Sequence, residues 1–231
     1  HVIHRRQRQM CIRDRGKARD NWSSLSLDER IKWLEKIANA LEARSEEIAK
    51  LESLDTGKPI KIARAVDASR SVANFRFFAE FSKDFHEQKF LMEDATNHVI
   101  FKPVGIAGLI TPWNLPLYLL SWKIAPAIVM GNTVVAKPSE LTPLTANLLA
   151  EVFDEVGLPA GVVNIVHGFG HETGQAIVSH PHVNLISFTG GTITGKKVAE
   201  TAAPMFKKLS LELGGKNATI VLDDVNLDSA I

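Results

Sequence analysis

Two motifs contain polar groups that could take part in a reaction. In Thr111-Pro112-Trp113-Asn114-Leu115-Pro116, two prolines restrict the turn and Asn114 supplies a carboxamide. A primary amide at the end of a strand can donate a hydrogen bond to an oxygen that gains negative charge during a reaction. Asn also commonly caps its own turn, so the motif alone leaves a catalytic and a structural role open.

The second such group is the carboxylate of Glu212, in Leu211-Glu212-Leu213-Gly214-Gly215-Lys216. In apolar surroundings, desolvation would raise the pKa of this glutamate and suit it to act as a general base. The alternation of leucines with Ser210 and Glu212 fits equally well a strand whose glutamate points to solvent, because an unpaired buried carboxylate is costly. Both interpretations stay open.

A cation and a carboxylate stand close together in Lys137-Pro138-Ser139-Glu140. At the carboxyl edge of a parallel sheet, a carboxylate can accept hydrogen bonds from ribose hydroxyls and would repel a 2′-phosphate, which favours NAD over NADP. The alternative is a solvated lysine and a glutamate that stabilises the N-terminus of a helix beginning near Thr142.

Two glycine-rich stretches could bring backbone close to a phosphate. Gly168-Phe169-Gly170-His171-Glu172-Thr173-Gly174 differs by one residue in spacing from the usual dinucleotide motif, and its glycines could equally serve only a tight passage from strand to helix. Phe188-Thr189-Gly190-Gly191-Thr192 directly precedes a predicted helix, whose free N–H groups suit a pyrophosphate. A plain glycine turn is the alternative there.

Composition and missing motifs narrow the function classes. The 231 residues are 45% apolar and contain no apolar run long enough to cross a bilayer, so a cytoplasmic protein without a membrane partner is expected. The single cysteine, Cys11, cannot form an internal disulfide or a zinc cluster, and the histidines show no ligand spacing. We therefore expect no metal site, and motifs of zinc proteases, P-loop NTPases and esterases are missing.

The net charge of +1 hides an uneven distribution. Five arginines and one acid fall within residues 1–15, and the rest of the chain is slightly acidic. A basic arm could bind nucleic acid, but this one has no interleaved aromatic residues and no basic stripe follows it. Residues 1–17 are therefore interpreted as a disordered or non-native leader outside the fold, and no nucleic-acid partner is expected.

The residues ahead of the motifs are predicted to be helical. Ser26 and Glu29 form a capping-box pair, a second helix covers about 45–56 with Gly57 as its C-terminal cap, and Pro59 opens a third. That third helix is expected to place three aromatic side chains in the core: Phe77, Phe78 and Phe81. A hairpin is predicted over about 88–103, with its turn at 94–97.

From residue 104 onward, short apolar runs alternate with helical stretches. Strands are expected over 105–111, 133–136, 162–166, 185–188, 209–213 and 218–222, and helices over 117–130, 142–156, 172–179 and 191–202. This alternation predicts an α/β fold: a doubly wound, Rossmann-like parallel sheet with an N-terminal helical leader and a protruding hairpin. Ligands of such sheets bind at the carboxyl ends of the strands, where all of the motifs above stand.

Taken in order, the five motifs resemble the signature series of the NAD-dependent aldehyde dehydrogenase superfamily. The resemblance covers roughly residues 18–231 and includes Leu51-Glu52-Ser53-Leu54-Asp55-Thr56-Gly57-Lys58-Pro59. It implies that residues 18–231 form the NAD-binding domain, including the hairpin. Within the superfamily, the stretches 114–120 and 122–126 look most like the branch that acts on 2-aminomuconic or 2-hydroxymuconic semialdehyde.

The resemblance also implies roles for individual residues. Asn114 corresponds to the oxyanion-hole amide and Glu212 to the general base that activates the deacylating water. Residues that correspond to cofactor contacts are Ile110, Thr111, Pro112, Trp113, Lys137, Ser139, Glu140, Gly170, Gly174, Phe188, Gly190, Gly191 and Leu213. The family commonly has Ser where this chain has Gly191, which removes one hydroxyl contact but keeps the backbone donors.

The family's nucleophilic cysteine follows the glutamate at a position beyond Ile231, and Cys11 is no substitute for it. We therefore expect an NAD-dependent enzyme for a small aldehyde, homo-oligomeric at full length, of which this chain is an N-terminal piece without activity of its own. The alternative is a non-catalytic nucleotide-binding or interaction module with the same fold.

Overall fold

The computed structural model describes residues 18–85, 87–218 and 220–226. Its main sheet has five parallel strands: β3 (Ile106–Ile110), β4 (Thr133–Lys137), β5 (Val163–Ile165), β6 (Leu185–Thr189) and β7 (Lys208–Glu212). Their order is β5-β4-β3-β6-β7, so the chain winds outward from β3 in one direction and then from β6 in the other. This is the doubly wound order of dinucleotide-binding folds, and it confirms the expected fold class.

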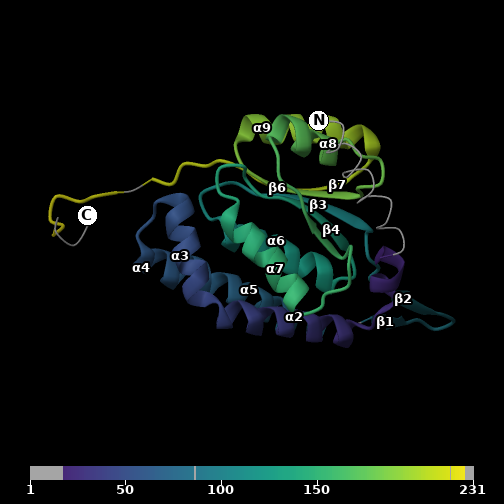
Figure 1. Cartoon of the computed structure of the whole chain (residues 1–231). Coiled ribbons are helices and arrows are strands. Elements are labelled where there is room, and N and C mark those ends of the chain that lie inside the picture. The colour runs from purple at the N-terminus through teal and green to yellow at the C-terminus, as the bar shows by residue number, and fades with distance from the viewer. Residues whose placement is uncertain (1–17, 86, 219, 227–231) are drawn as a thin grey trace.

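Helices cover both faces of this sheet (Figure 1). One face carries α6 (Pro116–Val129) and α7 (Leu144–Glu155); the other carries the π-helix η3 (Gly170–Gly174), α8 (Gln175–Val178), α9 (Thr192–Ala202) and the short 3-10 helix η4 (Ala203–Met205). Every residue of β3 and β4 is buried, as apolar strands of a parallel sheet must be when helices cover both faces. The two faces have separate apolar clusters.

The N-terminal residues form a further helical layer beneath α6 and α7 (Figure 1). Residues 18–24 are helical, and then come α2 (Leu27–Ala43), α3 (Ser45–Thr56), α4 (Ile60–Ile62), the π-helix η1 (Ala63–Ala68), α5 (Ser69–Phe81) and the 3-10 helix η2 (Ser82–Asp84). The capping box of Ser26 and Glu29 is formed, and Gly57 ends α3 with φ +75°, both as predicted.

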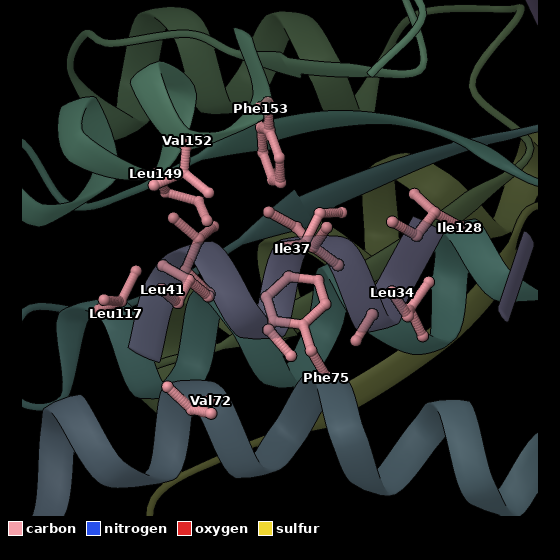
Figure 2. Close-up of a cluster of buried hydrophobic side chains, with 14 of the residues drawn as sticks. Leu34, Ile37, Leu41, Val72, Phe75, Leu117, Ile128, Leu149, Val152 and Phe153 are labelled. Carbon is pink, nitrogen blue, oxygen red and sulfur yellow. The ribbon is translucent and has the colours of Figure 1, made fainter. Parts of the chain in front are cut away.

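One apolar cluster joins this layer to the sheet domain. Figure 2 shows side chains of α2, α5, α6 and α7 meeting there: Leu34, Ile37, Leu41, Val72, Phe75, Leu117, Ile128, Leu149, Val152 and Phe153. The buried indole of Trp22 adds a hydrogen bond of 2.9 Å to the carbonyl of Ile128. The helical leader therefore shares its core with the helices that cover the sheet.

The prediction that Phe77 and Phe81 belong to this core is wrong. They are 50% and 52% exposed, because α5 turns its Val72 and Phe75 face inward. Phe77 stacks instead on Phe81 and on Trp122 of α6, with ring centroids 5.7 and 6.1 Å apart, and the partly buried Phe78 joins them. We call Phe77, Phe78, Phe81 and Trp122 the surface aromatic cluster.

The predicted hairpin consists of β1 (Gln88–Leu91) and β2 (Thr96–Val99), paired antiparallel and exposed throughout. Its turn lies at 92–95, slightly earlier than predicted. The strand predicted over 218–222 is not formed by the residues described there, because the chain runs away from the sheet after β7 (Figure 1). Within the described ranges, no helix combines the length and apolarity needed to cross a membrane.

Candidate active site

The strand register brings the predicted motifs together. Ile110, the last residue of β3, lies beside Lys137 of β4 and Phe188 of β6, and Thr189 lies beside Glu212 of β7. Parallel strands end at the same edge of a sheet, so the segments that follow these residues share one edge. That edge includes the place where the winding direction changes, between β3 and β6.

The Asn114 turn connects β3 to α6. The backbone N–H of Thr111 donates to the carbonyl of Lys137 at 3.2 Å, and after this bond Trp113 and Asn114 are exposed. The following helix has Leu115 at its N-cap position without any side-chain cap, so the Asn114 amide does not cap it. The carboxamide therefore remains available to a ligand.

Glu212 meets a buried lysine that the sequence analysis did not single out. The Nζ of Lys123, on α6, lies 2.8 Å from Ser187 Oγ and 3.4 Å from Glu212 Oε1, while Thr189 Oγ1 donates to Glu212 Oε2 at 3.2 Å. Burial lowers the pKa of Lys123, and the negative charge of Glu212 partly opposes this. The carboxylate is thus held by donors on two sides.

The side chain of Glu212 is 48% exposed, so the apolar surroundings considered for it are not present in the described residues. The lysine beside it is 2% exposed. One sequence signal could have pointed to Lys123: it is a single charged residue within a helix of otherwise largely apolar side chains. A buried lysine of that kind needs a carboxylate or several hydrogen-bond acceptors nearby.

Lys137 and Glu140 form an ion pair at this edge, with Nζ and Oε2 2.7 Å apart. The Lys137 side chain is 3% exposed, so the alternative of a solvated lysine is wrong. Partial burial acts to raise the pKa of Glu140, but hydrogen bonds from Lys137 and the backbone hold it below its ordinary value. Ser139 is buried, and its hydroxyl accepts from the N–H of Leu141 at 3.2 Å.

The glycines of the two glycine-rich stretches differ in what surrounds them. Gly191 is the N-cap of α9, and a Cβ there would meet no atom within 4 Å, as at Gly170. A Cβ at Gly190 would stand 2.5 Å from the buried ring of Phe188, so that glycine is needed for packing. Gly174 is buried, with its Cβ position 3.8 Å from the Lys137 side chain. Open space over the N-terminus of α9 leaves its backbone donors accessible.

Residues 3–231 match the sequence model of the family described as "Aldehyde dehydrogenase family". The chain belongs to the aldehyde dehydrogenase family. The match begins within the basic leader, residues 1–17, which lies outside the described residues and which the sequence analysis had left unmatched.

Three similar proteins place the chain within the aldehyde dehydrogenases. It is 53% identical over 213 residues to 2-aminomuconic semialdehyde dehydrogenase of Homo sapiens and 47% identical over 216 residues to 2-hydroxymuconic semialdehyde dehydrogenase of Pseudomonas sp. (strain CF600). Each comparison covers 91% of this chain and 44% of the relative, so the chain spans less than half of their length. The predicted resemblance to this branch is confirmed.

The third is a solved structure, the NAD+ complex of an aldehyde dehydrogenase from Bacillus cereus. It has a TM-score of 0.85 and 42% identity, over 90% of this chain and 43% of that one. The residues at this sheet edge fit a dinucleotide on their own chemistry. They combine an accessible helix N-terminus, an acceptor carboxylate in Glu140 and a buried Thr111 hydroxyl without a protein partner. Among the described residues, no cluster of side chains could hold a metal ion.

Proposed function

We propose that the protein oxidises an aldehyde to a carboxylate with NAD, and that residues 18–231 form its NAD-binding domain, with the hairpin at about 88–103 included. The observation that carries the proposal is the meeting of four features at one sheet edge: the Asn114 turn, the Lys137–Glu140 pair, the N-terminus of α9 and Glu212. In this proposal, the residues that complete the substrate pocket, including the family's cysteine, lie in the part of the family's sequence that this chain does not cover.

The cofactor is proposed to lie along this edge. Glu140 accepts from the adenosine ribose while Lys137 and Ser139 hold the turn around it, and the N–H groups at the N-terminus of α9, which Gly191 caps, bind the pyrophosphate. Gly190 shapes the turn before them, since its own N–H donates to the Glu212 backbone carbonyl at 3.0 Å. The surrounding cleft is formed by Ile110, Thr111, Pro112, Trp113, Gly170, Gly174, Phe188 and Leu213. NAD, when bound, supplies the hydride acceptor.

Asn114 and Glu212 are proposed to act on the reacting groups. The Asn114 amide donates to the aldehyde oxygen as that oxygen takes up negative charge after attack by the cysteine. That attack gives a thiohemiacetal, which would become a thioester by losing a hydride to the bound acceptor. Glu212 then accepts a proton from the water that hydrolyses this thioester, releasing the carboxylic acid and the thiol. Lys123 and Thr189 hold the Glu212 carboxylate from two sides, which limits the directions in which it can meet that water.

The substrate is proposed to be a muconic semialdehyde, as in the names of the two relatives, which exceed 45% identity over nearly all of this chain. We further propose a cytoplasmic homo-oligomer without nucleic-acid or membrane partners. The exposed hairpin strands and the exposed β7 edge support an assembly, since unpaired edges invite pairing.

The decisive experiment is the Asn114→Ala substitution in the protein with its cysteine-bearing portion, with Asn21→Ala, at an exposed position of the N-terminal helix, as control. Loss of one oxyanion donor should lower kcat by roughly 100- to 1000-fold. The control should retain full turnover. Undiminished aldehyde oxidation by Asn114→Ala would refute the assignment of this turn.

A further inference from the structure

The motif at residues 51–59 stands beside the site without a part in the chemistry proposed above. It covers the end of α3 and the turn after it, and hydrogen bonds hold this turn at Lys58. The hydroxyl of Ser53 donates to the Lys58 carbonyl at 2.7 Å, and the Lys58 N–H donates to Thr56 Oγ1 at 3.3 Å. Gly57, at φ +75°, permits the sharp reversal that turns Lys58 back toward the protein.

The Lys58 ammonium joins two segments that are distant in the sequence. Its Nζ lies 2.8 Å from Oδ1 of Asp67, a fully buried residue of the π-helix η1, and 3.4 Å from the backbone carbonyl oxygen of Asn114. The lysine side chain is only 16% exposed. A cation fixed by a buried carboxylate therefore donates to the peptide unit that follows the proposed oxyanion amide.

Glu52 adds a second carboxylate to this cluster. It is fully buried, and neither carboxylate oxygen has a hydrogen-bond partner. The charges that act on it are those of Asp67 and Lys58, and the other polar groups facing it are the Thr145 hydroxyl and the N–H of Leu117, in the first turn of α6. The cluster thus contacts the first turn of α6, the helix that follows the Asn114 turn.

We propose that Lys58 is a positioning residue for the Asn114 carboxamide, and that Asp67 holds its ammonium in place. The inference rests on the proposed function, which gives Asn114 its role. A donor on the Asn114 carbonyl fixes the plane of the peptide unit between Asn114 and Leu115, and so limits the directions open to the Asn114 side chain. Neither proline of the turn can do this, since both lack an N–H and lie outside that peptide unit.

The burial of these charges argues for a positioning role over simple stabilisation. An apolar pair of similar volume generally stabilises a core as well as a buried ion pair does, without the cost of desolvation. What an apolar pair cannot supply is a directed donor. Here that donor reaches the exposed turn at the sheet edge. The other backbone hydrogen bonds described for this turn lie at its two ends, from the Thr111 N–H to the Lys137 carbonyl and from the Leu119 N–H to the Leu115 carbonyl.

The test is hydrogen–deuterium exchange, in the 231-residue chain, of the two hydrogen-bonded amides that bound the turn: Thr111, which donates to Lys137, and Leu119, which donates to Leu115. Because Lys58→Met alone leaves Asp67 as a buried unpaired charge, the informative variant is Lys58→Met with Asp67→Asn, which removes both charges. Lys58→Arg is the conservative variant, and Lys61→Met, at an exposed lysine three residues away, is the matched control.

Loss of the charge-assisted hydrogen bond should speed exchange in the turn by about fivefold in the double variant, with α7 amides unaffected. Lys58→Arg and Lys61→Met should exchange like the unmodified chain. Unchanged exchange in a folded double variant would overturn the proposal. So would a double variant that loses its fold, because the cluster would then serve the fold and not the turn.

This outcome is independent of the proposed function. Exchange reports the turn whether or not it serves an oxidation, whereas the Asn114→Ala experiment reports the chemistry alone. In the protein with its cysteine-bearing portion, the double variant should lower kcat and leave the KM for NAD unchanged, since the ribose and pyrophosphate contacts are untouched.

Discussion

Three lysines, Lys58, Lys123 and Lys137, are buried beside carboxylates, which is unusual for lysine. Their side chains are mostly buried, at 16%, 2% and 3% exposure, and each ammonium lies near a carboxylate. Burying an ammonium is costly unless a carboxylate and further acceptors compensate. Because such a pair tolerates little displacement, each lysine fixes the place of its partner. The three partners are Asp67, Glu212 and Glu140.

At Glu140, replacement by Ser should narrow the preference for NAD over NADP. A 2′-phosphate about 4 Å from this carboxylate would meet a repulsion on the order of 4 kcal/mol at an effective dielectric near 20, before screening. Lys137, 2.7 Å from the carboxylate, offsets part of it, so we expect a preference of roughly ten- to a hundredfold in the unmodified protein.

Calorimetric titration of the chain with NAD and NADP measures this ratio, with Glu35→Ser, at an exposed position of α2, as control. Removing Glu140 should improve NADP binding more than it weakens NAD binding. Equal binding of the two cofactors before substitution would place Glu140 away from the ribose.

At Glu212, replacement by Gln should separate the two halves of the reaction. The amide cannot accept the proton of water, so hydrolysis of the thioester should slow while hydride transfer continues. Rapid mixing of the protein in its cysteine-bearing form should then show a burst of NADH followed by a steady rate reduced by roughly 100-fold or more. Glu200→Gln, on the exposed side of α9, is the control. A lost burst with an unchanged steady rate would contradict this role.

Among the elements, those fixed by local signals were predictable from the sequence. The capping box at Ser26, the glycine cap at Gly57 and the apolar strands of the sheet depend on residues close together in the chain, and all were predicted. Which face of α5 is buried depends on α2 and α6, so Phe77 and Phe81 were placed wrongly in the core. The π-helices η1 and η3 leave no sequence signal either.

In the candidate site, too, features set by local sequence could be predicted and features set by distant contacts could not. The motifs follow strands in the sequence, so their convergence at one edge could be predicted from the alternation of strands and helices. Lys123 lies far from Glu212 in the chain, as Lys58 does from Asn114, and no local pattern joins them. Their pairing becomes visible only when α6 and α3 are placed in space.

For α2, loss of its N-cap has a predictable cost. Ser26→Ala removes the acceptor for the Glu29 N–H and should lower the free energy of unfolding by about 1 kcal/mol. Ser69→Ala, at an exposed position of α5, is the matched control and should change it by less than about 0.5 kcal/mol. Urea unfolding measures both. Equal effects of the two substitutions would mean that the cap contributes nothing to stability.

At the scale of the whole molecule, helical leader and sheet domain share one apolar cluster, so they should unfold together. Glu52 lies within this shared interior and gives it a pH dependence. Burial raises the pKa of Glu52 from 4.5 to about 7, with Asp67 adding to the effect and Lys58 opposing it. The folded chain therefore binds this proton more tightly than the unfolded chain does.

The stability that this proton provides is complete below about pH 4.5 and is lost as the pH rises through 7. Each pH unit in that interval should cost on the order of 1.4 kcal/mol of unfolding free energy. Glu52→Gln imitates the protonated acid and should lack this pH dependence. Its free energy of unfolding should therefore exceed that of the unmodified chain by more at pH 8 than at pH 5. Glu35→Gln, exposed on α2, should behave like the unmodified chain. If the unfolding free energies of Glu52→Gln and the unmodified chain differ by the same amount at pH 5 and pH 8, Glu52 titrates in the folded chain as it does in the unfolded chain.

The strand order has a consequence for how the protein is made. β3 is paired on one side by β4, which follows soon after, but its other neighbour is β6, whose Leu185 lies beside Ala107. During synthesis on the ribosome, the side of β3 that will meet β6 stays open until α7, β5 and α8 have also emerged. The nascent chain can complete the layer of α2, α5, α6 and α7 over that time, and the edge that carries the Asn114 turn closes only when β6 arrives.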